Sequence, residues 1–407
     1  MATDPLAAID AALLELDQHS ARRSRRIVEE GCSTRVTVDG RTLLAFCSND
    51  YLGLARHPAV VRALAEGARR YGAGSGASHL ISGHCRAHAD LEEKLAALFA
   101  TRLDSPRALY LSSGYAANVA LISTLAASGG AGGCEIFSEA LNHASLVDGA
   151  RLARGRSGAA ISVYRHLDCE DLARLLARSG AAVKIIATDS VFSMDGEIAP
   201  LAALIDLAER YGAWLVVDDA HGFGVLGERG TGVLELLGLR SRNLCYVGTL
   251  GKAAGVAGAF IAAHHRCIEW LINLARPYIY STAAPPAVAC AVDAALDIIT
   301  GEDGMLRRQQ LRSLAAQWRA TLRLRGWRLL PSTTPIQPVV VGSNEAALGA
   351  AAQLLARGLW VPAIRPPTVP PGTARLRVSL SAGHSAADVD RLTSALADVE
   401  SIAQGNA

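Results

Sequence analysis

The chain has 407 residues, of which 50% are apolar and 19% are charged, and its formal net charge is +2. This length allows two or three domains with a large core, and the apolar share excludes a disordered or fibrous protein. The near-neutral charge gives no reason to expect a nucleic-acid or membrane partner. The basic cluster Arg22, Arg23, Arg25 and Arg26 is interpreted at first as a solvated face.

Eight cysteines are spread along the chain without a C-x-x-C pair. This pattern predicts neither a metal cluster nor a disulfide framework, so a reducing, cytoplasmic setting is the simplest expectation. The first residues lack the basic start and apolar stretch of a secretory signal. The uncharged stretch 108–128 is rich in Ser, Gly, Asn and Tyr, and we expect a buried strand and helix there rather than a membrane span.

Residues 1–47 are predicted to form an N-terminal helix and a β-hairpin. Asp4-Pro5 is typical of a helix start, and the residues after it place an apolar stripe at helical spacing. The stripe consists of Leu6, Ile9, Leu13 and Leu16. We expect this amphipathic helix to pack on a larger body. Asp39-Gly40 joins two strand-like runs, 34–38 and 41–46, which indicates a hairpin.

Residues 48–284 alternate short apolar runs with helical segments such as 169–179 and 201–211. The runs are 108–111, 135–137, 160–164, 184–188, 214–217, 244–247 and 259–262. This pattern predicts an α/β domain with a mostly parallel, seven-stranded sheet covered on both faces. Ligands of such sheets bind at the carboxyl ends of the strands, where Ser113, Asp218 and Lys252 are expected to lie.

Residues 285–407 are predicted to form a smaller C-terminal α+β domain. Pro285-Pro286 opens a long alanine-rich helix, and a second helix is expected around 306–325. Strands follow near 336–341 and 375–381. The proline-rich stretch between them is interpreted as a rigid active-site loop.

Lys252 ends the run Thr249-Leu250-Gly251-Lys252, just past an apolar stretch and among small residues. A lysine amine forms a Schiff base only when it is unprotonated, and such surroundings lower its pKa. Upstream lies Asp218-Asp219-Ala220-His221, which offers a carboxylate from a neighbouring strand. A carboxylate there suits the pyridinium nitrogen of pyridoxal 5′-phosphate, so we predict that this chain binds that cofactor.

Six motifs in their order give the chain a family resemblance. They are Ser48–Gly53, Gly74–Ser78, Asn142–Ser145, Val191–Gly196, Asp218–Gly222 and Thr249–Lys252. Together they resemble the α-oxoamine synthases, fold-type-I pyridoxal-phosphate enzymes that condense an amino acid with an acyl thioester and release carbon dioxide. The segment Ala363–Pro370 resembles the member of that family that joins L-alanine to a pimeloyl thioester. The resemblance implies a homodimer with a shared site, and leaves open whether the acyl carrier is coenzyme A or a carrier protein.

The resemblance implies roles for four residues around the cofactor ring. Lys252 would carry the cofactor and then act as the general base. Asp218 would pair with the pyridinium nitrogen, with Asp219 as the competing candidate. His221 would contact the phenolic oxygen, and His143 would lie against the ring and also handle substrate.

Further cofactor contacts are expected at the phosphate and the phenolic oxygen. Gly114 and Tyr115 follow a strand and begin an apolar helix, where backbone N–H groups hold phosphate. Thr249 would add a hydroxyl to the phosphate. Ser193 would reach the phenolic oxygen or the substrate carboxylate.

Arginines are the candidates for substrate binding. Arg375 and Arg377 share one face of a strand, and a bidentate arginine suits a carboxylate. The family pattern favours Arg377, with Asn49 as a second contact and Arg375 as structural. Thr368 and Arg22, or its neighbour Arg23, match positions that contact acyl substrate in the family.

Other activities are weighed against this one. Related synthases use glycine with acetyl-CoA or serine with a long acyl-CoA, and an aminotransferase would consume no thioester. A catalytically inactive partner subunit or a regulator is the non-enzymatic alternative, but Lys252 is present. Small departures from the family pattern, Ala77 within Gly76-Ala77-Ser78 and Tyr115, remove no functional group. The expected reaction requires no metal.

Overall fold

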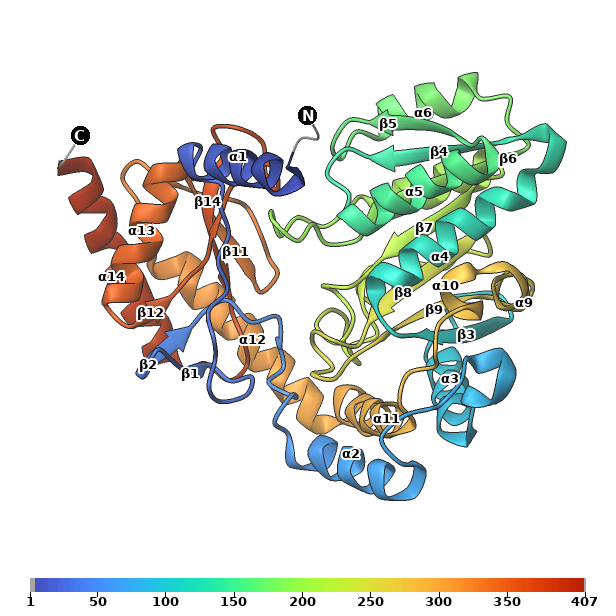
Figure 1. Ribbon diagram of the computed structural model, residues 1–407, viewed down its shortest axis with the longest axis horizontal. Helices are drawn as coiled ribbons and strands as arrows, with labels where there is room; N and C mark the ends of the chain where they lie inside the picture. Colours follow the sequence, from blue (N-terminus) through green and yellow to red (C-terminus); the bar gives the residue numbers. More distant parts are fainter. Residues whose placement is uncertain (1–3, 406–407) are drawn as a thin grey trace. The chain divides into compact units, whose positions relative to one another are not determined.

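The computed structural model describes residues 4–405, and contacts divide the chain into two compact units (Figure 1). The first unit comprises residues 1–49, 194–196 and 310–407, and the second comprises residues 50–193 and 197–309. The predicted segment boundary at 284/285 therefore falls inside the second unit, and the N-terminal segment groups with the C-terminal part of the chain.

The second unit is built on a seven-stranded sheet, as predicted, with strand order β3-β9-β8-β7-β6-β4-β5. The strands are β3 (Pro106–Leu111), β4 (Cys134–Glu139), β5 (Ala160–Tyr164), β6 (Val183–Asp189), β7 (Trp214–Asp218), β8 (Leu244–Thr249) and β9 (Ala259–His264). β9 pairs antiparallel with both β3 and β8, and the other pairs are parallel. The sheet is therefore mostly parallel, which confirms the predicted α/β class.

Both faces of this sheet are buried. On one face, strand residues such as Leu109, Ile185 and Val247 join a single apolar cluster. That cluster includes residues of α4 (Gly114–Ala126), α5 (Ala144–Ser157) and α9 (His265–Leu274). Alternate strand residues such as Tyr110 and Leu215 are also buried, as expected of a sheet covered on both sides.

Further helices complete the second unit (Figure 1). They are α2 (Pro58–Tyr71), α3 (Arg86–Leu98), α6 (Cys169–Arg178), α7 (Leu201–Arg210), α8 (Val233–Leu236), α10 (Arg276–Ile279) and α11 (Pro286–Thr300). A π-helical turn, His79–Gly83, precedes α3. The proline pair opens α11 as predicted, since Pro286 is its first residue and needs no N–H partner there.

The connection between β8 and β9 carries Lys252 and is a short loop rather than a helix. Leu250 and Gly258 close its base, because the Leu250 N–H donates to the Gly258 carbonyl at 2.9 Å. Inside the loop, the Val256 N–H donates to the Leu250 carbonyl at 3.0 Å, and the Gly255 N–H donates to the Lys252 carbonyl at 2.8 Å. The backbone around Lys252 is therefore fixed from both strands.

The first unit contains two small sheets, with strand orders β1-β2-β12 and β10-β11-β14-β13. Their strands are β1 (Arg35–Val38), β2 (Arg41–Ala45), β10 (Arg328–Leu329), β11 (Ile336–Gly342), β12 (Leu359–Trp360), β13 (Ala363–Ile364) and β14 (Ala374–Ser379). The long helices near them are α13 (Asn344–Ala356) and α14 (Ala386–Gly405). α12 (Glu302–Thr321) contributes its residues from Gln310 onward to this unit. The α+β character matches the prediction.

The N-terminal helix and hairpin are present as predicted, with each strand one residue shorter than expected, but the packing of the helix differs from the prediction. Asp39 and Gly40 both have positive φ, 51° and 69°, as the tight turn between β1 and β2 requires. α1 (Pro5–Gln18) is capped by Asp4, which accepts a hydrogen bond from the Leu6 N–H at 3.0 Å. However, no residue of α1 is buried, so the expectation that its apolar stripe packs on a larger body is wrong for this chain alone. In the described part of the chain, no helix is long and apolar enough to cross a membrane.

Candidate active site

Four strands of the second unit run in the same direction and present polar residues at one edge. Asp189 ends β6 and Asp218 ends β7, and the two are register partners. Thr249 ends β8, and Ser113 follows β3 and caps α4. The carboxyl edge of the sheet therefore gathers the predicted residues, as expected for a ligand site of an α/β sheet.

Asp218 is buried and held by two hydrogen bonds. Its Oδ2 accepts from Asn118 Nδ2 at 2.6 Å, and its Oδ1 accepts from the Ala220 N–H at 2.9 Å. Asn118 also donates to Ser145 Oγ at 2.8 Å, while its own Oδ1 has no hydrogen-bond partner among the described residues. Sequence reasoning missed Asn118, although an amide in the middle of an apolar helix was a signal.

Asp219, the competing carboxylate, is engaged elsewhere. It accepts hydrogen bonds from Tyr246 at 2.6 Å, from the Val233 N–H at 2.8 Å, and from Ser190. Burial raises the pKa of Asp219 to about 7, against the effect of these hydrogen bonds. Asp219 thus accepts hydrogen bonds from three protein donors and Asp218 from two, and the assignment of Asp218 as the cofactor partner stays a prediction.

Lys252 lies at the end of a short chain of polar side chains. Its Nζ is 2.9 Å from His221 Nε2, and His221 Nδ1 is 2.7 Å from the Tyr51 hydroxyl. Both His221 and Tyr51 are buried. The structure therefore joins Lys252 to His221, which were predicted together, and adds Tyr51, which was noted only within a motif.

His143 caps α5 and is linked to the same centre. Its Nδ1 is 2.7 Å from Ser145 Oγ, the hydroxyl that also contacts Asn118. Burial lowers the pKa of His143, the Asp218 charge opposes this shift, and the Lys252 charge adds to it. His143 is therefore neutral at pH 7, and the charges of Asp218 and Lys252 both act on it.

Asp189 was not predicted, yet it positions His143. The His143 backbone N–H donates to Asp189 Oδ2 at 2.7 Å. Asp189 is buried, and burial together with the neighbouring Asp218 carboxylate raises its pKa well above the ordinary value. The backbone at the start of α5 is thereby fixed to the end of β6.

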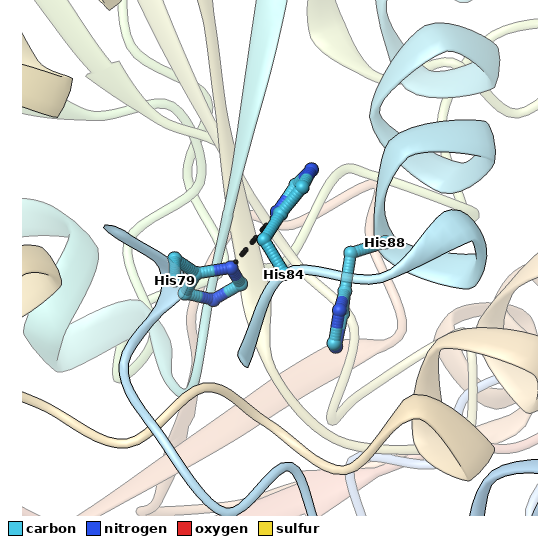
Figure 2. Close-up of side chains that lie close together, drawn as sticks. All are labelled: His79, His84 and His88. Carbon is cyan, nitrogen blue, oxygen red and sulfur yellow. Dashed lines mark hydrogen bonds between the residues drawn. The ribbon is translucent and has the colours of Figure 1, made fainter. Parts of the chain in front are cut away.

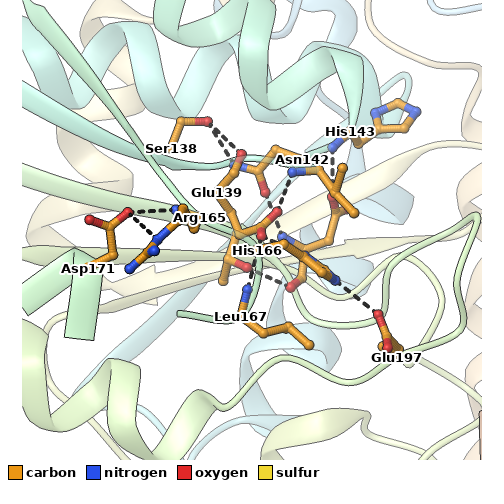
Figure 3. A network of polar contacts seen from close by, with 12 residues as sticks. Ser138, Glu139, Asn142, His143, Arg165, His166, Leu167, Asp171 and Glu197 are labelled. Carbon is orange, nitrogen blue, oxygen red and sulfur yellow. Dashed lines mark hydrogen bonds and ion pairs between the residues drawn. The ribbon is translucent and has the colours of Figure 1, made fainter. Parts of the chain in front are cut away.

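A second polar network surrounds the turn that leads into His143 (Figure 3). His166 Nδ1 lies 2.6 Å from Glu139, and its Nε2 lies 2.9 Å from Glu197. Burial acts to lower the pKa of His166, but hydrogen bonds and charges of the two carboxylates outweigh it and raise the pKa to about 9. Asn142 Nδ2 donates to the Ala187 carbonyl at 2.8 Å, which ties the turn to β6. A charged His166 therefore braces this turn at neutral pH.

The start of α4 has the features of a phosphate site. Ser113 caps the helix by accepting from the Ala116 N–H at 3.1 Å. A Cβ added to Gly114 would lie 2.7 Å from Thr249 Oγ1, so only glycine leaves room beside that hydroxyl. Tyr115 is 49% exposed and its hydroxyl donates to Asp148 at 2.5 Å. A helix N-terminus next to a hydroxyl suits a phosphate group.

These residues fit pyridoxal phosphate by their chemistry. A lysine amine suits an aldehyde, a buried carboxylate suits a pyridinium nitrogen, and a glycine-lined helix start suits a phosphate. The acceptor Oδ1 of Asn118 is left for a donor that the described residues do not supply. Ser193 lies half-buried in the turn 190–198 that follows β6. That turn begins beside β7, because the Ser190 N–H donates to the Asp218 carbonyl at 2.8 Å.

In the first unit, the two arginines of β14 have different partners. Arg375 Nη1 forms an ion pair with Asp195 at 2.5 Å and donates to the Met194 carbonyl at 3.1 Å. Arg377 Nη1 donates to Ser379 Oγ at 2.7 Å and lies 3.3 Å from Asn49 Oδ1. The structure thus brings Arg377 and Asn49 together, and it pairs Arg375 with a carboxylate of the protein.

The first unit also contains a cavity of about 580 Å³ lined by Arg22, Arg23 and Thr368. Arg23 Nη2 donates to Thr368 Oγ1 at 3.1 Å, whereas Arg22 pairs with Asp17 at 2.7 Å. Apolar residues such as Leu355 and Trp360 complete the lining. The basic cluster is therefore not only a solvated face, and of its first two residues Arg23 is the one bonded to Thr368.

Comparisons with known proteins give a consistent family. The family model "Aminotransferase class I and II" matches residues 41–396. An 8-amino-7-oxononanoate synthase of Bordetella petrii is 63% identical, over 95% of this chain and 96% of the relative. One from Janthinobacterium sp. (strain Marseille) is 60% identical, over 97% and 98%.

Solved structures agree. The chain is similar to a Sphingomonas wittichii serine palmitoyltransferase, with a TM-score of 0.86 and 30% identity over 98% of both chains. It is also similar to a structure described as SPT with PLP internal aldimine, with a TM-score of 0.88 and 29% identity over 99% and 100%. An 8-amino-7-oxononanoate synthase of Francisella tularensis matches with a TM-score of 0.72 and 27% identity over 88% and 97%.

Proposed function

We infer the reaction from one premise: the chain belongs to the aminotransferase class I and II family and, within it, to the 8-amino-7-oxononanoate synthases. It is therefore a pyridoxal-phosphate-dependent acyltransferase. It condenses L-alanine with a pimeloyl thioester to give 8-amino-7-oxononanoate, carbon dioxide and the free thiol carrier, a reaction of biotin biosynthesis. The observation that carries this assignment is 63% identity to the Bordetella petrii synthase over 95% of the chain.

Lys252, Asp218 and His143 are the proposed catalytic residues. Bound pyridoxal phosphate supplies an aldehyde and an electron-accepting ring. Asp218, fixed by Asn118, would hold the proton on the ring nitrogen. Lys252 would remove the α-proton of the amino acid and later return a proton to the same carbon. A neutral His143 adds no positive charge beside Lys252, so the lysine amine is easier to keep unprotonated.

The remaining second-unit residues would bind the cofactor. Gly114, Tyr115 and Thr249 would hold the phosphate at the start of α4, where Gly114 leaves room beside the Thr249 hydroxyl. His221 would contact the phenolic oxygen, since its ring is fixed between Lys252 and Tyr51. Ser193 would contact the same oxygen or the substrate carboxylate.

The first unit supplies the proposed carboxylate contacts. Arg377, with Asn49, would bind the amino-acid carboxylate, because its guanidinium is buried and contacts the neutral partners Ser379 and Asn49. The cavity near Thr368 combines arginines with apolar walls, which suits an acyl chain that ends in a carboxylate. Arg23 contacts Thr368, so Arg22 or Arg23 would bind the distal carboxylate of the pimeloyl group.

Offering alanine, glycine and serine separately with pimeloyl and acetyl thioesters tests this function. We expect carbon dioxide release only with alanine and the pimeloyl thioester, with the ketone product identified by mass. Preferred use of serine with a long acyl thioester would instead make the enzyme a synthase of the palmitoyltransferase kind, to which two of the solved neighbours belong, at 29% and 30% identity.

The partners and setting are part of the proposal. We propose a homodimer, as the family resemblance implies, acting on small-molecule substrates in the cytoplasm. The cysteines of the described residues form no disulfide bond, which agrees with a reducing compartment. Parallel assays with pimeloyl-CoA and the pimeloyl acyl carrier protein decide which carrier is used, and light scattering of the holoenzyme measures the subunit number.

A further inference from the structure

Three histidines that have no assigned role in the reaction converge in the second unit (Figure 2). His79 begins the π-helical turn, His84 follows it, and His88 lies in the first turn of α3. One ring nitrogen from each lies within 4.8 Å of the other two, and the Nδ1 atoms of His79 and His84 are 3.0 Å apart. This separation is close to that of two nitrogens on one tetrahedral metal ion, whose bonds are about 2.0–2.1 Å long.

The ring of His88 is oriented as a metal-binding imidazole is. Its Nε2 lies 2.8 Å from the Ala284 carbonyl oxygen, which only accepts hydrogen bonds. The proton therefore sits on Nε2, and Nδ1 carries the lone pair. Metal-binding histidines commonly donate their other ring N–H to a backbone carbonyl in this way. The His88 Nδ1 now accepts a long, 3.2 Å hydrogen bond from the Cys85 N–H, which a metal ion would replace.

The rings of the other two histidines are also restrained. His79 stacks on Tyr278, with ring centroids 4.7 Å apart and an interplanar angle of 12°. His79 and His88 are nearly or fully buried, whereas His84 is exposed and leaves a route from solvent. The Cys85 Sγ lies 3.5 Å from His88 Nδ1, so a thiol stands next to the three nitrogens.

The contact between His79 Nδ1 and His84 Nδ1 is a hydrogen bond, so one of these two nitrogens carries a proton and the other a lone pair. A metal ion bound between them would take the place of that proton.

We propose that His79, His84 and His88 form a binding site for one divalent transition-metal ion of the zinc class, with Cys85 as the nearest fourth ligand. Imidazole with thiolate suits zinc and cobalt, whereas magnesium and calcium prefer oxygen ligands. The bound ion joins the turn 79–83 to the start of α3, and the His88–Ala284 hydrogen bond extends this link to the segment before α11. The inference does not depend on the proposed reaction.

The test uses the holoenzyme after treatment with a chelator, titrated with Zn²⁺ against a coloured indicator and with Co²⁺ by absorption. We expect one ion per chain at micromolar concentration and the intense visible bands of a tetrahedral Co²⁺ site. His84→Gln and His79→Gln should each weaken Zn²⁺ binding by more than the roughly 10- to 100-fold typical of an outer contact. His84 is exposed, so its variant should fold and retain its activity.

His265→Gln is the matched control, because His264 and His265 form another close pair, with ring centroids 4.2 Å apart. It should bind Zn²⁺ as the unmodified chain does. Absence of stoichiometric binding, equal affinity in the His84→Gln and His79→Gln proteins, or loss of binding only in the control would overturn the proposal. The three rings would then be a hydrogen-bonded and stacked cluster that holds the start of α3.

Discussion

The two units prepare their functional groups in different ways. In the second unit, Lys252, His221 and Asp218 are connected to other side chains that are themselves buried, so their positions are set before any ligand binds. In the first unit, Arg377 is equally buried, but Arg22 and Arg23 are exposed. We infer that the proposed proton-transfer groups of the second unit are held in place before substrate binds, whereas Arg22 and Arg23 become ordered only when the far end of the substrate binds to them. Five experiments challenge or refine this contrast.

Lys252→Ala should have the largest effect. Loss of both the cofactor attachment and the proposed base should lower carbon dioxide release by at least about 10³-fold. The protein should remain folded, because Lys252 lies in a loop closed by backbone hydrogen bonds. Borohydride reduction of the unmodified enzyme should leave the cofactor mass on the peptide that contains Lys252. Cofactor mass on another peptide would contradict the assignment.

The neighbouring carboxylates should separate activity from stability. Asp218→Asn should reduce turnover by about 10²- to 10³-fold with little change in thermal midpoint, because an electrostatic partner of the ring is lost. Asp219→Asn places an amide against the three donors that now bond to Asp219, so the main loss should be about 1–3 kcal/mol of unfolding free energy. The reverse pattern, measured by kinetics and thermal denaturation, would exchange their roles.

The β14 arginines provide a matched pair in the first unit. Arg377→Ala should raise the KM for alanine by roughly ten- to hundredfold, as expected for a lost hydrogen bond to a charged group. Arg375→Ala leaves Asp195 without its buried partner and should cost roughly 3–5 kcal/mol of stability. If Arg375→Ala changed KM and left the melting temperature intact, Arg375 would be the substrate contact.

The raised pKa of His166 predicts that the stability of the folded protein depends on pH. Its pKa is about 9 in the folded protein and has an ordinary value of 6.5, so the folded state binds the proton more tightly. The resulting stabilisation is complete below pH 6.5 and is lost as the pH rises through about 9. Thermal midpoints measured from pH 6 to 10 should therefore fall more steeply for the unmodified protein than for His166→Gln. Parallel curves would show that the Glu139–His166–Glu197 network does not stabilise the fold.

The exposed arginines should give the smallest effect. Arg23→Ala should raise the KM for the pimeloyl thioester about twofold to fivefold, because solvent screens an exposed ion pair. Arg22→Ala should change it less, since Arg22 pairs with Asp17. Initial rates at varied thioester concentration measure both, and a larger effect from Arg22→Ala would assign the contact to Arg22.

Local pattern was enough to predict much of the fold. The limits of β5 were predicted to the residue, because a short run of strand-forming residues lies between turn signals, although only Tyr164 of this edge strand is buried. Strand alternation also favoured Asp218 over Asp219 as the cofactor partner, which stays a prediction. The apolar stripe of α1 was interpreted correctly as a helix, but its packing depends on partners that a periodicity does not identify.

The long-range contacts that complete the sites could not be predicted from the local sequence pattern. Asn118 meets Asp218 across 100 positions of sequence, and His166 bridges carboxylates 27 and 31 residues away. The histidines at 79, 84 and 88 are close in sequence, but their spacing matches no simple face of a helix. A π-helical turn brings them together, and sequence periodicity does not predict such a turn.

The loop between β8 and β9 fixes the backbone that carries Lys252. Its main chain is hydrogen-bonded next to a strand at either end, and a four-carbon side chain separates this backbone from the Nζ atom, which contacts His221 at 2.9 Å. After Lys252 releases the cofactor it is proposed to carry, its amine would return to the same position, because the backbone that supports it stays in place. Repeated turnover would then require movement of one side chain and no rearrangement of the loop.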